Sequence, residues 1–190
     1  MKKFVYGIVW AFAAMSAADV FAAGALPARY TEVEYIQGNG SDTRIVTDYT
    51  PQPNTDKIEA VVSFPTLDKT MTIWCARGSS TTTASWTMFM INDSGYKLRL
   101  DYGSVNNKYF APTLSANTKY MVTAEGNVGT WTNGTGVTHT KVADFTAGGP
   151  VTLFASYVNG TGNSVDNWGN HRLYSFKVWR SGEQIGRAHV

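Results

Sequence analysis

Hydrophobic and polar residues alternate along most of this 190-residue chain. The clearest case is the segment 57–64 (KIEAVVSF), where Ile58, Ala60, Val62 and Phe64 fall on one side. Successive side chains of a β-strand point to opposite faces of a sheet, so this two-residue period predicts a strand with one buried face. Beyond residue 22, no stretch of about a dozen residues has the period of an amphipathic helix.

Short segments of the same kind follow one another and are separated by turns rich in Gly, Pro, Asn and Asp. The expected strands are 30–36, 43–49, 57–64, 70–76, 85–91, 97–103, 108–110, 119–125, 129–133, 137–145, 151–157 and 171–179. Many short strands at regular spacing predict an all-β fold, a two-sheet antiparallel β-sandwich of jelly-roll type. We find no internal repeat and no linker, so we expect one domain.

The last expected strand has a clear alternation. Tyr174, Phe176 and Val178 should share one face, while Ser175 and Lys177 should share the other.

A turn signal, Ser181-Gly182, follows this strand and predicts a hairpin partner. The chain instead ends with IGRAHV at 185–190. Followed by a stop, these residues are spelled by ATC GGA AGA GCA CAC GTC TGA, which is the sequence of a common short-read sequencing adapter. We therefore expect 185–190 to be adapter read-through rather than native, and the domain at 25–184 to lack its last strand. A missing strand that pairs with the first one would leave an open edge near 31–36. The alternative is a genuine tail.

Residues 1–22 have the layout of a secretory signal peptide: a basic start at Lys2 and Lys3, an apolar run over 4–15, and small residues before Ala23. A membrane anchor is the alternative, but the run is shorter than the roughly 20 apolar residues that spanning requires. We expect a secreted or cell-surface protein, with no membrane insertion after cleavage.

The charge balance excludes a nucleic-acid partner. The chain has 16 basic and 14 acidic residues. Without Lys2, Lys3, Asp19 and Arg187, which fall in the two terminal segments, 13 of each remain. There is no Lys/Arg cluster to bind a phosphate backbone. The single cysteine, Cys75, excludes an intrachain disulfide. By alternation it should share a face with Met71 and Ile73, as a small buried residue.

Several motifs in order resemble bacterial laminin-G-like domains of the concanavalin A-like lectin/glucanase superfamily. They are VEYIQGNGSDTRIVTDYTPQPNTDKIEAVVSF at 33–64, WCARG at 74–78, KLRLDYGS at 97–104, VTLFASYVNGTG at 151–162 and HRLYSFKVWRSGEQ at 171–184. The resemblance covers roughly 30–184, nearly the whole chain after the signal segment. It implies the jelly-roll fold, and it specifies no ligand.

The resemblance implies a non-catalytic carbohydrate-binding module, with a polysaccharide or glycan as partner, as part of a larger cell-surface or secreted protein. A second hypothesis is a structural or adhesive module that contacts a cell-surface protein. A third is a glycoside hydrolase, which needs two convergent carboxylates. Glu32 and Glu34 share a strand face, but that alternation is more typical of a solvated surface.

Sugar binding combines aromatic rings, which stack on pyranose faces, with polar side chains that hydrogen-bond hydroxyl groups. The candidate carbohydrate-binding residues are Trp168, Asn167, Trp131, Arg77, Arg99 and Asp101. Arg99 and Asp101 face opposite to Leu98 and Leu100, and an ordinary ion pair between them is the alternative. We expect two other tryptophans, Trp74 and Trp86, to lie in the core.

Calcium is the cofactor that the resemblance allows, and no other is expected. The ion takes six to eight oxygen ligands. Asp166, Asn163 and Asp48 are the candidate ligands, and turn residues that cap their own backbone are the alternative. His139 and His171 lack metal-ligand spacing and read as surface or strand-end residues.

Overall fold

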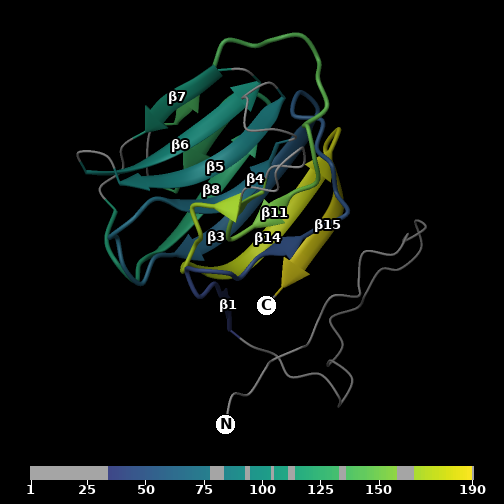
Figure 1. The fold of residues 1–190 in the computed structure, drawn as a ribbon. Coiled ribbons are helices and arrows are strands. Elements are labelled where there is room, and N and C mark those ends of the chain that lie inside the picture. Colours follow the sequence, from purple (N-terminus) through teal and green to yellow (C-terminus); the bar gives the residue numbers. More distant parts are fainter. Residues whose placement is uncertain are drawn as a thin grey trace, which may run out of the picture. The chain divides into compact units, whose positions relative to one another are not determined.

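The computed structural model describes residues 34–77, 84–92, 95–103, 105–110, 114–132, 136–157 and 165–189. The expected signal segment 1–22 lies outside these residues. A unit spanning Val33–Val190 contains the sandwich. The described residues form strands, turns and irregular segments without a helix, which confirms the all-β prediction (Figure 1).

The first sheet has seven strands in the order β1-β14-β3-β8-β9-β10, with β15 also paired to β14. Its strands are β1 (Ile36–Gln37), β3 (Asp56–Ser63), β8 (Lys119–Glu125), β9 (Val128–Trp131), β10 (Val137–Thr138), β14 (Arg172–Arg180) and β15 (Glu183–His189).

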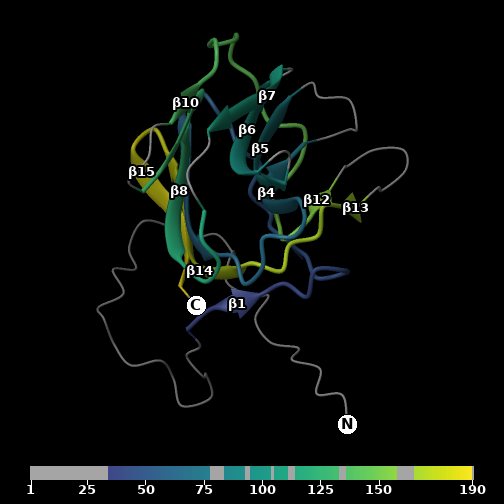
Figure 2. The ribbon, with the colours of Figure 1, turned by 90° about the vertical axis from the view of Figure 1, so that its left-hand side faces the viewer.

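The second sheet has six strands in the order β2-β11-β4-β5-β6-β7. They are β2 (Ile45–Val46), β4 (Met71–Ala76), β5 (Ser85–Asn92), β6 (Tyr96–Gly103), β7 (Val105–Phe110) and β11 (Thr152–Leu153). A small hairpin pairs β12 (Ser156–Tyr157) with β13 (Val165–Asp166). The two main sheets stand face to face, with the core between them (Figure 2).

Alternating apolar residues from both sheets fill this core. In β3, Ile58, Ala60 and Val62 are fully buried, as the alternation predicts. Trp74 and Trp86 are also fully buried, which confirms the core interpretation of both. Each large apolar side chain stabilises the fold by roughly 1.5–3 kcal/mol on burial.

A β-bulge changes the predicted faces of β14. The register with β3 shifts between Leu173 and Ser175. Leu173 therefore joins Phe176 in the core, while Tyr174 is half-buried and packs edge-on against Tyr35 at 5.5 Å between ring centroids. The expectation that Tyr174 shares a face with Phe176 and Val178 is wrong, because an extra residue reverses the alternation on one side of the bulge.

The chain forms a hairpin after β14, so the partner strand that the turn signal predicts is present as β15. That the domain lacks its native last strand stays a prediction. Arg180 pairs with Glu183 across a two-residue turn, in which Ser181 and Gly182 have φ angles of 51° and 85°. Positive φ at both positions is the geometry of a type I′ turn, which suits the twist of a hairpin. β15 pairs with β14 as far as His189. That the codons for 185–190 come from an adapter stays a prediction.

The first strand does not need β15 as a partner. Ile36 and Gln37 of β1 pair with Leu173 and Arg172 of β14. β1 and β15 therefore follow one another along the same side of β14, and β3 occupies its other side.

Two expected strands, 137–145 and 151–157, are shorter than the sequence pattern indicates. The segment 151–157 divides into β11 and β12, because Phe154 between them has a φ of 67°. The segment 137–145 keeps only Val137–Thr138 as a strand, since His139 then turns inward and is 2% exposed. His171 is fully buried as well, so the surface interpretation of both histidines is wrong.

Candidate functional site

The outer face of the second sheet carries a band of polar side chains across β4, β5 and β6. In one cross-strand row, Cys75 lies opposite Thr87, and Thr87 lies opposite Asp101. In the next row, Phe89 lies between Thr72 and Arg99. Side chains of directly opposed residues project from the same face. The row thus brings residues from three strands together.

A bulge in β4 determines which residues reach this outer face. The register with β5 shifts between Thr72 and Trp74. Trp74 therefore points into the core, and Cys75 points outward beneath Thr87, whose hydroxyl lies 3.5 Å from the Cys75 sulfur. Cys75 is buried, as predicted, but it does not share the face of Ile73 in the core.

Asp101 is the centre of the polar band. Its side chain is 0% exposed, and it accepts from two arginines on either side. Arg77 Nη2 lies 3.0 Å from Asp101 Oδ2, and Arg99 Nε lies 2.9 Å from Asp101 Oδ1. A buried carboxylate is stable only when it is paired in this way. The structure therefore brings together three of the six predicted residues, and the predicted pair of Arg99 with Asp101 is present within this larger cluster.

An aromatic ring lies beneath the two guanidinium groups. Phe89 is 1% exposed, and its ring centroid lies 4.6 Å from Arg99 Cζ and 5.8 Å from Arg77 Cζ. A guanidinium group above a ring face gains a favourable cation–π interaction. The ring and the carboxylate together fix both arginines, whose side chains keep 13% and 20% of their surface exposed.

The chemical capacity of the cluster is donation of hydrogen bonds. A guanidinium group has five N–H donors in a planar fork. Two guanidinium groups and one carboxylate leave a net positive charge at this face. Asp101 is covered by its partners, so its role is to position Arg77 and Arg99 rather than to contact a ligand.

The segment of Asn167 and Trp168 lies beside the same row. The Asn167 carbonyl accepts from the backbone N–H of Thr72 at 2.9 Å. The Thr72 hydroxyl also lies 2.7 Å from the Ser156 hydroxyl of β12. Because Thr72 is the cross-strand partner of Phe89, this contact places Asn167 at the border of the polar band. Trp168, the next residue, is half-buried.

Trp131 belongs to a different part of the fold. It ends β9 in the first sheet, and its ring packs against Tyr120 with 5.2 Å between centroids. It also packs against the core cluster. The structure therefore does not place Trp131 with the other candidate carbohydrate-binding residues.

The described residues do not supply a calcium coordination set. Asp48 is exposed in the segment after β2, Asp166 lies in β13, and Asn163 lies outside the described residues. Within the described ranges, no group of three or more His, Cys, Asp or Glu residues could hold a metal ion. Calcium binding stays a prediction.

Two other carboxylates, those of Glu34 and Glu59, are engaged in ion pairs. Glu32 lies outside the described residues, and its predicted neighbour Glu34 is exposed and pairs with Lys119 at 3.1 Å. Glu59 pairs with Lys177 at 3.1 Å. These two carboxylates are thus held by lysine rather than by each other, whereas a retaining glycosidase needs two carboxyl groups about 5 Å apart.

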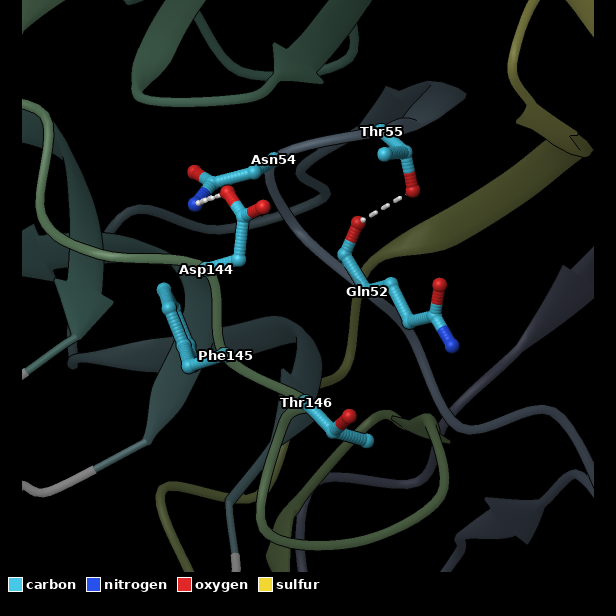
Figure 3. Close-up of a pocket in the computed structure, with 6 residues that line it drawn as sticks. All are labelled: Gln52, Asn54, Thr55, Asp144, Phe145 and Thr146. Atoms are coloured by element: carbon cyan, nitrogen blue, oxygen red, sulfur yellow. Dashed lines mark hydrogen bonds between the residues drawn. The ribbon is translucent and has the colours of Figure 1, made fainter.

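Sequence reasoning missed one cavity, at the end of the sandwich where β3 begins. Two loops face each other there, and the cavity between them has a volume of about 190 Å³ (Figure 3). The lining residues are Gln52, Asn54, Thr55, Asp144, Phe145 and Thr146. The only sequence signal was that both segments are rich in turn-forming and polar residues.

Comparisons with known proteins give the fold alone. No protein family matches the chain, and no curated protein matches it. Among solved structures, the native heptameric SAP-like pentraxin from Limulus polyphemus superposes with a TM-score of 0.56 at 16% identity, over 80% of this chain and 77% of that one.

Two further structures have a similar fold. Domains LG4-5 of the mouse laminin α1 chain give a TM-score of 0.52 at 12% identity, over 87% of this chain and 48% of that one. Tailspike protein 2 of an Escherichia coli O157:H7 bacteriophage gives 0.51 at 14% identity, over 78% of this chain and 23% of that one.

The domain therefore shares the two-sheet jelly-roll fold of these structures, which is the fold that the sequence resemblance implied. Within the described part of the chain, no helix has the length and apolar character needed to cross a membrane.

Proposed function

We propose that this domain is a non-catalytic, lectin-like carbohydrate-binding module, and that it binds its ligand at the outer face of the second sheet. The observation that carries the proposal is the pair of guanidinium groups of Arg77 and Arg99. A single buried carboxylate, Asp101, orients both of them above the ring of Phe89. Preorganised donors of this kind lose little conformational entropy on binding.

The chemistry of the face suits a polyhydroxylated ligand. Guanidinium N–H groups that are not used by Asp101 donate to sugar hydroxyl oxygens, or to a carboxylate of an acidic sugar. Trp168 borders the face and offers a ring on which a pyranose can stack. Tyr109 lies opposite Arg99 on β7, with Lys97 Nζ at 5.5 Å from its ring centroid, and extends the polar and aromatic surface.

The proposed setting is outside the cell. The signal segment 1–22 directs the chain to secretion, and the module acts on a polysaccharide or glycan at the cell surface. The fold supports this class of function only by analogy, because one sandwich architecture carries many activities.

A binding assay on residues 23–190 tests the proposal, with a glycan array and soluble polysaccharides, in calcium and in chelator. The variants are Arg99→Gln and Trp168→Ala, and the matched control is Lys141→Gln, at an exposed position outside β4, β5 and β6. We expect each of the first two to weaken binding about tenfold, as loss of a charged hydrogen bond or a stacking ring does.

Two results would contradict the proposal. The first is a folded domain that binds no glycan in either condition, which would favour the structural or adhesive alternative. The second is glycan binding that both variants leave unchanged. Loss of binding in chelator would support the calcium prediction.

A further inference from the structure

We infer that the cavity between the loops 52–55 and 144–146 is a second binding site, which takes a single neutral sugar ring. The cavity shares no lining residue with the Arg77, Asp101 and Arg99 cluster. The inference goes beyond the proposed function, because it assigns a separate site and does not require the first one.

The carboxylate of Asp144 is the fixed acceptor of this site. Asn54 Nδ2 donates to Asp144 Oδ1 at 2.8 Å, and Asn54 Oδ1 in turn accepts from the hydroxyl of Tyr102. Tyr102 is fully buried in the core. The three residues form a chain that anchors an exposed carboxylate to the rigid interior. Figure 3 shows the bond between Asn54 and Asp144.

The orientation of these hydrogen bonds leaves one carboxylate oxygen of Asp144 as an acceptor for a ligand. The Asn54 amide also donates to the carbonyl of Val142 at 3.4 Å, which agrees with its nitrogen facing the loop of Asp144. Asp144 Oδ2 has no hydrogen-bond donor among the described residues. A carboxylate held in this way can accept from a sugar hydroxyl at little entropic cost.

Neutral polar groups complete the lining. The side chains of Gln52 and Thr146 are exposed, and they add an amide and a hydroxyl that both donate and accept. Phe145 is half-buried, because it packs edge-on against Tyr102 at 5.3 Å between ring centroids. Its remaining ring surface adds an apolar wall to the polar lining. A sugar ring has the same combination, because its hydroxyl groups lie next to apolar C–H faces.

Size and charge define the ligand class. About 190 Å³ is less than the 300–1,000 Å³ of pockets for drug-sized ligands, so the cavity suits one ring. The six lining residues include one carboxylate and no basic side chain. An acidic sugar would be repelled by Asp144, and one carboxylate is too few for a calcium site of six to eight oxygens.

The test is an NMR titration of the 15N-labelled domain, residues 23–190, with the methyl glycosides of glucose, galactose, mannose and N-acetylglucosamine. We expect at least one to shift the amide signals of 52–55 and 144–146 saturably. A ligand with about a dozen heavy atoms should bind with a dissociation constant on the order of millimolar. Asp144→Ala should weaken this binding about tenfold, whereas the exposed control Asp68→Ala should not.

The inference is overturned if no glycoside shifts these signals up to about 100 mM, or if Asp144→Ala binds as well as the native chain. Thr146→Val provides a second variant at an exposed position if Asp144→Ala unfolds. Arg99→Gln separates the two sites, because it should weaken polysaccharide binding at the sheet face about tenfold and leave the glycoside shifts unchanged. Glycoside shifts with no polysaccharide binding would contradict the proposed function alone.

Discussion

Asp56 and Arg180 are joined by two hydrogen bonds of 3.0 Å each, which connect the first residue of β3 to the last residue of β14. Asp56 is 1% exposed and also accepts from the Gln52 backbone at 2.7 Å and from the Tyr49 hydroxyl at 2.6 Å. Burial raises the pKa of Asp56, but the hydrogen bonds from Arg180, Gln52 and Tyr49 outweigh it and lower the pKa below its ordinary value.

The first prediction concerns this carboxylate. Asp56→Ala should lower the free energy of unfolding by about 3 kcal/mol, because it removes one partner of a buried charged network. Urea denaturation measures the change, and Asp68→Ala, at an exposed position, is the control. A loss below about 1 kcal/mol would show that solvent screens the pair as at an ordinary surface site.

The second prediction concerns pH. Burial lowers the pKa of His171 from 6.5 to about 3, and neither ring nitrogen has a hydrogen-bond partner among the described residues. Below pH 6.5 the imidazole of His171 is protonated in the unfolded chain but stays neutral in the native structure. The free energy of unfolding should therefore fall, by about 1.4 kcal/mol per pH unit for this one group.

A variant separates His171 from the other titrating groups. The ring of His171 stacks on Phe154 with 4.6 Å between centroids, so His171→Leu keeps an apolar contact and removes the proton. Between about pH 6.5 and 4.5 its stability should decrease less steeply than that of the native chain. His139 also has a lowered pKa through burial, and it accounts for part of the remaining slope. Equal slopes in both chains would refute the prediction.

The third prediction concerns the arginine cluster. Asp101→Asn should destabilise the domain by about 2–4 kcal/mol, because two largely buried guanidinium groups would lose their shared counter-charge. Asp68→Asn is the matched surface control. If Asp101 only positions Arg77 and Arg99, glycan affinity should also decrease, although Asp101 itself is covered. An unchanged melting temperature would contradict the buried arrangement.

The fourth prediction concerns β15. A chain that ends after Gly182 exposes the edge of β14 from Ser175 to Arg180, where β15 otherwise pairs. Unpaired strand edges add strands from other molecules. Sedimentation velocity should show concentration-dependent self-association of this chain, while the chain that ends at Val190 stays monomeric. Monomers of both at all concentrations would show that β14 tolerates an open edge.

Alternation along the strands was enough to predict the sandwich and most of its core. It failed at Tyr174 and at Cys75, where bulges reverse the faces. A bulge depends on how two strands distant in sequence are aligned, and no local pattern records that alignment. The surface interpretation of His139 and His171 was wrong for a similar reason, since a strand residue next to a turn can face either way.

The candidate site was predictable in part. Arg99 and Asp101 share a face by alternation. That Arg77 lies beside them depends on the order of β4, β5 and β6 in the sheet, which the sequence alone does not show. The cavity was not predictable, because Asn54 and Asp144 are 90 residues apart and meet only through the folded core.

The position of β14 determines when the first sheet can form during synthesis of the chain. β14 lies beside β3 in the middle of the first sheet, and Phe176 pairs with Ala60. On a ribosome, β3 emerges long before β14 has been made. Such long-range pairing folds slowly. The first sheet can close only after the last strands of the chain have emerged, so an incomplete chain stays unfolded while it is being made.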